Sequence, residues 1–176
     1  MRLLISALLL MSAPIMAAAQ PAPPAPTAGL SEKMAPFAWL IGEWRGSGWT
    51  ILPDGRRETF DSHEVVTPRI GGNALLVEGR HTASGHPDVV VHDALAMMTW
   101  DRAANAYRFR SALANGLGGD SPVEVRANGF TWSIDTPGGR IDYVVAHENG
   151  TWTERGRLTR AGGQTSDFFE MSLRKH

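Results

Sequence analysis

Cysteine is absent from the 176-residue chain, so neither a disulfide nor a lipid-modified cysteine can form. Net charge is also small, at -1 for pH 7, and lysine and arginine are not gathered into a basic patch. Proteins that bind nucleic acids or anionic lipid surfaces normally carry such a patch, so both classes of partner are excluded. A chain of this length can bury enough apolar surface to fold on its core alone.

Long apolar runs are missing too, except at the N-terminus. Residues 1–19 begin with a basic Arg2, continue in an apolar run from Leu3, and end in three alanines before Gln20. This is the pattern of a secretory signal peptide cleaved after Ala19, which predicts a periplasmic or secreted protein. The run is shorter than the ~20 residues of a membrane span, so we expect no span after cleavage. An uncleaved anchor is the alternative.

The segment after this peptide is a spacer. Residues 20–30, QPAPPAPTAGL, are rich in proline and alanine, as extended linkers often are. We therefore expect one folded domain, over residues 31–176, which is an ordinary domain size. The sequence gives no indication of its oligomeric state.

Helical periodicity is confined to one short segment of this domain. Ser31 is a candidate N-cap for a helix of about two turns that ends at Gly42. Afterwards about ten short strand patterns alternate with glycine, proline and asparagine turns, of which Asn128-Gly129 is a typical hairpin turn. The sequence thus predicts an all-β fold, an up-and-down antiparallel closed β-barrel of about ten strands with one short N-terminal helix.

Alternation along the strands predicts which side chains point into the barrel. In 89–100 both faces are largely apolar, so alternation does not assign its inward face, and the N-terminal helix is a candidate cover for its outer one. In four other strands the alternation is clear. The side chains predicted to point inward there are Phe130, Trp132 and Ile134; Tyr107, Phe109, Ser111 and Leu113; Ile141, Tyr143 and Val145; and Trp152, Glu154, Gly156 and Leu158.

One short motif resembles a known family. Gly42-Glu43-Trp44, directly after the helix, resembles the G-x-W signature of lipocalin and calycin barrels. With Gly46 and Gly48 it is more similar still to nitrobindin-type barrels and related bacterial lipocalin-like domains of unknown function, over residues 34–174. The resemblance implies a structural plug in which an arginine near the end of the last strand, here Arg174, lies across Trp44. Such a cation over an indole contributes ~1–2 kcal/mol when shielded.

The same resemblance bears on cofactors. Nitrobindin-type barrels bind haem through a histidine in the C-terminal strand region, where this chain reads QTSDFFEMSLRK and has no histidine. We therefore expect no cofactor, with haem as the alternative. His63, His81 and His86 also lack the spacing of a compact metal site with a third ligand at hand, so no metal is predicted.

A few polar side chains share the predicted interior with aromatic ones. Glu154 alternates with Trp152 and Leu158, and a carboxylate inside a barrel requires a partner such as Arg110. Apolar lining with a few convergent polar groups is typical of small-molecule pockets. The predicted ligand-binding residues are Trp132, Tyr143, Glu154, Arg110, Phe109, Phe169 and His92.

Three functions are compatible with these observations. The first is a binding barrel for a small apolar or amphipathic molecule. The second is an enzyme that uses Glu154 or Glu170 with His92 as acid and base, although no residue is assigned a catalytic role. The third is an envelope interaction protein whose barrel is filled by its own side chains.

Overall fold

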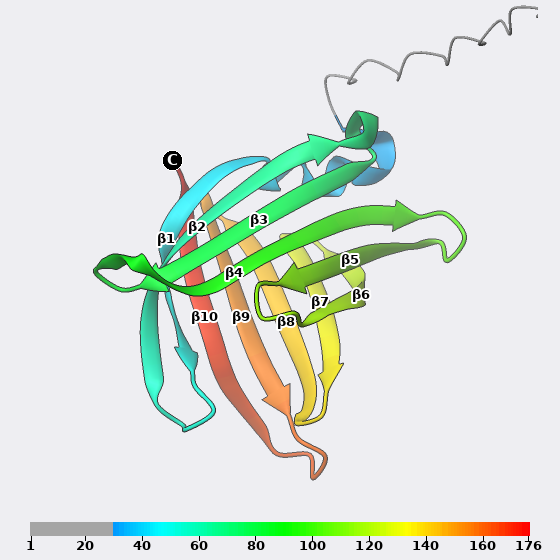
Figure 1. Cartoon of the computed structure of the whole chain (residues 1–176). Coiled ribbons are helices and arrows are strands. Elements are labelled where there is room, and N and C mark those ends of the chain that lie inside the picture. The colour runs from blue at the N-terminus through cyan, green and yellow to red at the C-terminus, as the bar shows by residue number, and fades with distance from the viewer. Residues whose placement is uncertain (1–29) are drawn as a thin grey trace, which may run out of the picture.

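The computed structural model describes residues 30–176, which form a closed antiparallel barrel (Figure 1). The predicted fold class is confirmed. The predicted signal peptide and, apart from Leu30, the linker lie outside the described residues. The strands of the described part are β1 (Gly42–Ile51), β2 (Arg57–Arg69), β3 (Ala74–Ala83), β4 (His86–Asp101), β5 (Ala106–Leu113), β6 (Gly118–Arg126), β7 (Gly129–Thr136), β8 (Gly139–Glu148), β9 (Thr151–Thr159) and β10 (Thr165–Lys175).

Each strand pairs with its neighbours in sequence, and β1 closes the sheet by pairing with both β2 and β10. Trp44, for example, lies opposite Glu64 on one side and Lys175 on the other. Closure pairs the two edge strands that a meander would leave exposed. No helix in residues 30–176 is long and apolar enough to span a membrane.

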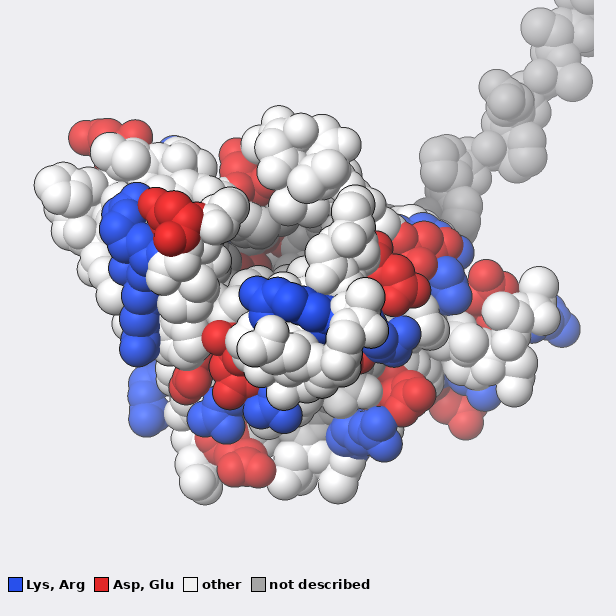
Figure 2. Space-filling view, turned by 90° about the horizontal axis from the view of Figure 1, so that it is seen from below, with Lys and Arg blue, Asp and Glu red and all other residues white. Residues whose placement is uncertain are grey.

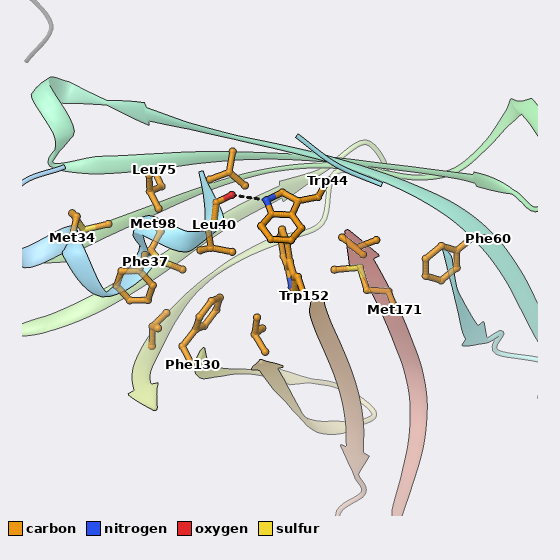
Figure 3. Packing of buried hydrophobic residues seen from close by; sticks show 14 residues of the cluster. Met34, Phe37, Leu40, Trp44, Phe60, Leu75, Met98, Phe130, Trp152 and Met171 are labelled. Atoms are coloured by element: carbon orange, nitrogen blue, oxygen red, sulfur yellow. Dashed lines mark hydrogen bonds between the residues drawn. The ribbon is translucent and has the colours of Figure 1, made fainter. Parts of the chain in front are cut away.

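A 3-10 helix, η1 (Glu32–Leu40), covers one end of the barrel, and a second short one, η2 (Ile70–Gly72), joins β2 to β3. Three η1 side chains, Met34, Phe37 and Leu40, are at most 1% exposed. They are three residues apart, which matches the three residues per turn of a 3-10 helix and places them on one face. Figure 3 shows this face packed beside Leu75 and Met98 inside the barrel.

Trp44 forms the floor of the barrel, at the end that this helix covers. Its side chain is fully buried, and its indole Nε1 donates a hydrogen bond of 2.7 Å to the carbonyl oxygen of Leu40 (Figure 3). The rings of Trp39 and Trp152 meet it edge to face, with centroids 6.2 and 5.6 Å away. The first strand is thereby fixed to the helix that covers the barrel's end.

The cation over this floor is Lys175 and not the predicted Arg174. Leu173 is buried, so alternation turns the next side chain, that of Arg174, to the exposed outer face. Lys175 lies opposite Trp44 in the strand register, and its Nζ is 5.2 Å from the centroid of the indole.

The glycines after Trp44 create space on the same inward face of β1. A Cβ at Gly46 would collide with the backbone oxygen of Ser172, and one at Gly48 would lie 2.5 Å from the ring of Phe60. Because these positions carry no side chain, residues of β2 and β10 meet across β1, with Ser62 Oγ 4.0 Å from Met171 Sδ. The motif thus combines a large side chain at the floor with two positions at which neighbouring residues approach β1 closely.

Replacing Gly46 with alanine should destabilise the barrel by about 2–3 kcal/mol, because β10 must move away from the added methyl group. Urea denaturation measures this difference. Gly162→Ala is the control, since no described atom lies within 4 Å of the place its methyl group would take and its φ is not positive. Equal stabilities of the two variants would contradict the close approach of β1 and β10.

The inward face of β4, which alternation could not assign, carries Ala94, Ala96 and Met98. The outer face is open to solvent, because Leu95 is 47% exposed, and the helix therefore does not cover it. The inward sets expected for β5, β7, β8 and β9 are found at the cavity or in the core, except for Leu158, which is half-buried.

Candidate ligand cavity

Above the Trp44 floor the barrel encloses a cavity of about 610 Å³, a size typical of small-molecule pockets. Figure 2 views the end that carries the β1–β2, β7–β8 and β9–β10 turns, where the molecule is hollowed. Two unlike surfaces line the cavity. On one side, small residues of β3 to β6 leave space for a ligand, namely Gly79, Ala94, Ala96, Ser111 and Gly118. Large aromatic rings cover much of the remaining wall, namely Phe60, Trp132, Tyr143, Phe168 and Phe169.

Six of the seven side chains predicted to bind a ligand line this cavity. Trp132 and Tyr143 are register partners on β7 and β8, and their rings stack with centroids 4.1 Å apart. Phe109 lies 4.8 Å from Trp132, and Phe169 stacks on Phe60 of β2 at 5.7 Å. The other two are Glu154 and His92.

Arg110 is not among them, because it lies on the outer face of β5. Its guanidinium donates to Asp120 at 3.2 Å and to Thr99 Oγ1 at 3.0 Å. Strand alternation explains this, since Phe109 and Ser111 on either side point inward. Glu154 therefore has no arginine partner from this strand.

Glu170 also lies outside. A bulge between Asp167 and Phe169 lets both Phe168 and Phe169 reach the cavity, and Glu170 then points outward beside Arg155 at 3.5 Å. The barrel wall separates this carboxylate from His92. The acid–base hypothesis is therefore wrong for Glu170. For Glu154, which lines the cavity together with His92, it stays a prediction.

Glu154 enters the cavity from β9 with one hydrogen-bond donor beside it. The indole Nε1 of Trp132 donates to its Oε1 at 3.3 Å. Burial, and then the nearby carboxyl of Glu64, raise the pKa of Glu154 to about 8. At neutral pH this group is mainly an uncharged carboxylic acid. Burial also raises the pKa of Tyr143.

A second carboxyl of the cavity, which was not predicted from the sequence, belongs to Glu64 on β2. It is 5% exposed and lies against His81, which is 6% exposed, with Oε1 3.1 Å from the imidazole Nε2. Burial raises the pKa of Glu64 to about 8 and lowers that of His81 to about 4. At neutral pH the pair is therefore mainly uncharged, a carboxylic acid hydrogen-bonded to a neutral imidazole.

The imidazoles form a stack at one side of the cavity. His81 lies between Phe60, at 4.3 Å, and His92, at 4.9 Å between ring centroids. Burial, and then the adjacent His81, lower the pKa of His92 to about 4. Gly79 provides the space for this group, because a Cβ there would lie 2.6 Å from Oε2 of Glu64.

A signal for Glu64 was present in the sequence. Phe60, Ser62, Glu64 and Val66 alternate along β2, and all four are buried. Polar residues lie between them, such as His63, and they made the whole strand resemble a solvated one. Alternation with Phe60 and Val66 would have placed Glu64 inside.

Metal and haem ligation are the remaining possibilities for these groups. Residues 30–176 contain no group of three or more histidine, aspartate or glutamate side chains arranged to hold a metal ion. The haem ligand of the resembled barrels would lie on β10, which has no histidine, and Nε2 of His81 already contacts Glu64. The residues present do not fit that mode of haem ligation, and no function is derived through haem.

Stability should fall as the pH rises from about 6.5 to 8. In this range the folded protein holds protons on Glu64 and Glu154 that the unfolded chain has released, since their pKa is about 8 when folded. Raising the pH therefore favours unfolding, by on the order of 1–2 kcal/mol for each carboxyl. The lowered pKa values of His81 and His92 give the opposite slope, but at pH values between about 4 and 6.5.

Urea denaturation at pH 6.5 and 8 measures this loss. Glu64→Gln should reduce it, because glutamine does not titrate, whereas Glu170→Gln on the outer face should keep it. A wild-type stability that is constant or rises over this range would contradict the buried neutral carboxyls.

No protein-family profile matches the sequence, and no curated protein matches it. Solved structures do match the fold. One is the crystal structure of Rv2717c from M. tuberculosis, with a TM-score of 0.65, 13% sequence identity, and coverage of 84% of this chain and 99% of that chain. At this identity the likeness concerns the fold alone. A closed ten-stranded antiparallel barrel with this structural neighbour fits the lipocalin-like fold.

Proposed function

We propose that the protein is a periplasmic or secreted barrel that binds a small, largely apolar molecule in its interior. The observation that carries this proposal is the cavity of about 610 Å³ above the Trp44 floor. A barrel filled by its own side chains would have no such space, so the cavity favours binding over the filled-barrel alternative. The N-terminal pattern of residues 1–19 supports the location.

The lining suits a flat apolar ligand with a few polar atoms. Aromatic rings offer large contact areas on one side, while Gly79, Ala96 and Ser111 leave room on the other. Burying apolar area contributes roughly 25 cal/mol per Å², which drives an apolar molecule into such a site. Glu64, Glu154 and the imidazoles supply the polar contacts that would orient it.

Titration with the neutral dye Nile red tests the proposal. We expect a saturable rise in dye emission at a ratio of one dye per chain, with quenching of tryptophan fluorescence because Trp132 lines the cavity. Native mass spectrometry of the purified protein should in addition detect a co-purifying small molecule. Absence of saturable dye binding would contradict the proposal.

Acid–base catalysis is a second candidate function, favoured by the Glu64–His81 pair at 3.1 Å. A group that exchanges protons with a bound molecule can act as a general acid or base. The test incubates the co-purifying molecule with protein in D₂O and follows deuterium uptake at carbon by mass spectrometry. Uptake with wild type that Glu64→Gln abolishes supports catalysis, and uptake by neither protein contradicts it.

A further inference from the structure

Among residues 30–176, carboxyl side chains line the cavity, whereas basic side chains of lysine or arginine do not. Glu64 and Glu154 enter it from β2 and β9, and Asp135 lies at its mouth with a side chain that is 84% exposed. The other titratable groups that face it are His81, His92 and Tyr143. An anionic ligand would therefore meet carboxyl groups and find no cation.

The two buried carboxyls line the same cavity, and the nearby carboxyl of Glu64 raises the pKa of Glu154. The hydrogen bonds between residues 30–176 and these carboxyls involve Oε1, with Ser62 and His81 on Glu64 and with Trp132 on Glu154. The Oε2 atom of each has no hydrogen-bond donor from the described chain.

Aromatic faces beside these oxygens are also suited to positive charge. Trp132 stacks on Tyr143, and its indole edge contacts Glu154. Phe60 and Phe169 stack near Glu64 and His81. A cation near the face of an aromatic ring is attracted by the ring quadrupole, most strongly where water is excluded.

We propose that the cavity selects apolar molecules that carry a basic nitrogen, and that the nitrogen binds as an ammonium group beside Glu64 and Glu154. The proposal rests on the proposed binding function and specifies its ligand class. The step conserves atoms and charge: an ammonium ion enters, one carboxylic acid becomes a carboxylate, and its proton passes to the solvent. The ion pair replaces water around the ammonium group, as a buried charge requires.

Three compounds that share one naphthalene ring test the charge preference, namely 2-naphthylmethylamine, 2-naphthylmethanol and 2-naphthoic acid. Each displaces Nile red from the protein at pH 8 and low salt. We expect the amine to bind about tenfold more tightly than the alcohol, which corresponds to a charge-assisted contact. The acid should bind most weakly.

Variants connect the preference to the two carboxyls. Glu64→Gln/Glu154→Gln should lose the preference of the amine over the alcohol, whatever its own affinity for Nile red. Direct calorimetric titration compares the two compounds on this variant, and circular dichroism verifies that it is folded. Asp135→Asn, at the exposed mouth, should keep the preference. Loss in Asp135→Asn but not in the double variant would overturn the assignment.

Calorimetry provides a second readout. Titrations at pH 7 in buffers of different ionisation enthalpy give the number of protons released. We expect nearly one proton per amine bound and none for the alcohol, because the buried carboxyls are mainly protonated at this pH.

The outcomes separate the two proposals. Binding of Nile red with equal or tighter binding of the acid, or amine binding without proton release, would overturn the ammonium site while binding itself stands. Failure of Nile red and all three compounds to bind would overturn both. A preference for the amine that the double variant retains would also overturn the assignment to Glu64 and Glu154.

Discussion

Replacing Ser111 with tryptophan should weaken Nile red binding at least tenfold. Ser111 lines the cavity from β5, and its register partners Ala96 and Gly119 are small. The added indole would extend from this wall into the space opposite the aromatic residues and occupy the volume that the dye needs. Since each 1.4 kcal/mol is a factor of ten in affinity, losing even part of the buried contact area reaches this effect.

The neighbouring residue provides a matched control. Ala112 is the next residue on β5, and its side chain is exposed on the outer face. Ala112→Trp adds the same side chain to the same strand outside the cavity, so Nile red affinity should stay within about twofold of wild type. Circular dichroism would verify that both variants are folded. Equal loss in both, or loss only in Ala112→Trp, would contradict binding inside the barrel.

Trp44→Ala should have the largest effect on stability, about 3–5 kcal/mol. The indole is fully buried, contacts the rings of Trp39 and Trp152, and donates to Leu40. Removing the indole would leave an unfilled volume in the floor itself. It would also remove the hydrogen bond that fixes η1 to β1. Urea denaturation would measure the loss, which is a large part of the 5–15 kcal/mol of a typical domain.

Comparison variants distinguish the floor from tryptophan content in general. Trp49 lies on the outer face of the same strand, with Arg57 4.1 Å from its ring centroid, so Trp49→Ala should cost less than about 1 kcal/mol. Lys175→Ala should cost about 0.5–1 kcal/mol and Arg174→Ala close to nothing, because Lys175 is the cation over Trp44. A larger loss for Arg174→Ala than for Lys175→Ala would contradict this assignment.

Local patterns predicted the barrel well because strand alternation and turn residues depend on near neighbours in the sequence. Trp132 and Tyr143 were placed inside from alternation alone, and the structure stacks them as register partners. The floor residue Trp44 was predicted differently, from the resemblance of Gly42-Glu43-Trp44 to the G-x-W signature of lipocalin barrels. These features require no knowledge of distant parts of the chain.

The wrong predictions concern strands in which a bulge interrupts the alternation, or residues to which the alternation rule was not applied. Glu170 follows a bulge that turns both Phe168 and Phe169 toward the cavity, and a bulge leaves no reliable mark in the sequence. Arg110 was assigned inward to balance Glu154, against its own alternation. The burial of Glu64 beside His81 also required the register of β2 against β3, which sequence spacing does not contain.

The central claim, that a small apolar molecule binds inside the closed barrel, is tested most directly by NMR of ¹³C-methyl-labelled methionine. Met171 and Met98 line the cavity, whereas Met97 lies between inward-facing neighbours on the opposite face of β4. Titration with 2-naphthylmethanol should shift the methyl resonance of Met171 in a saturable way and leave that of Met97 unchanged. Saturable shifts at Met97 with none at Met171 or Met98 would contradict the claim.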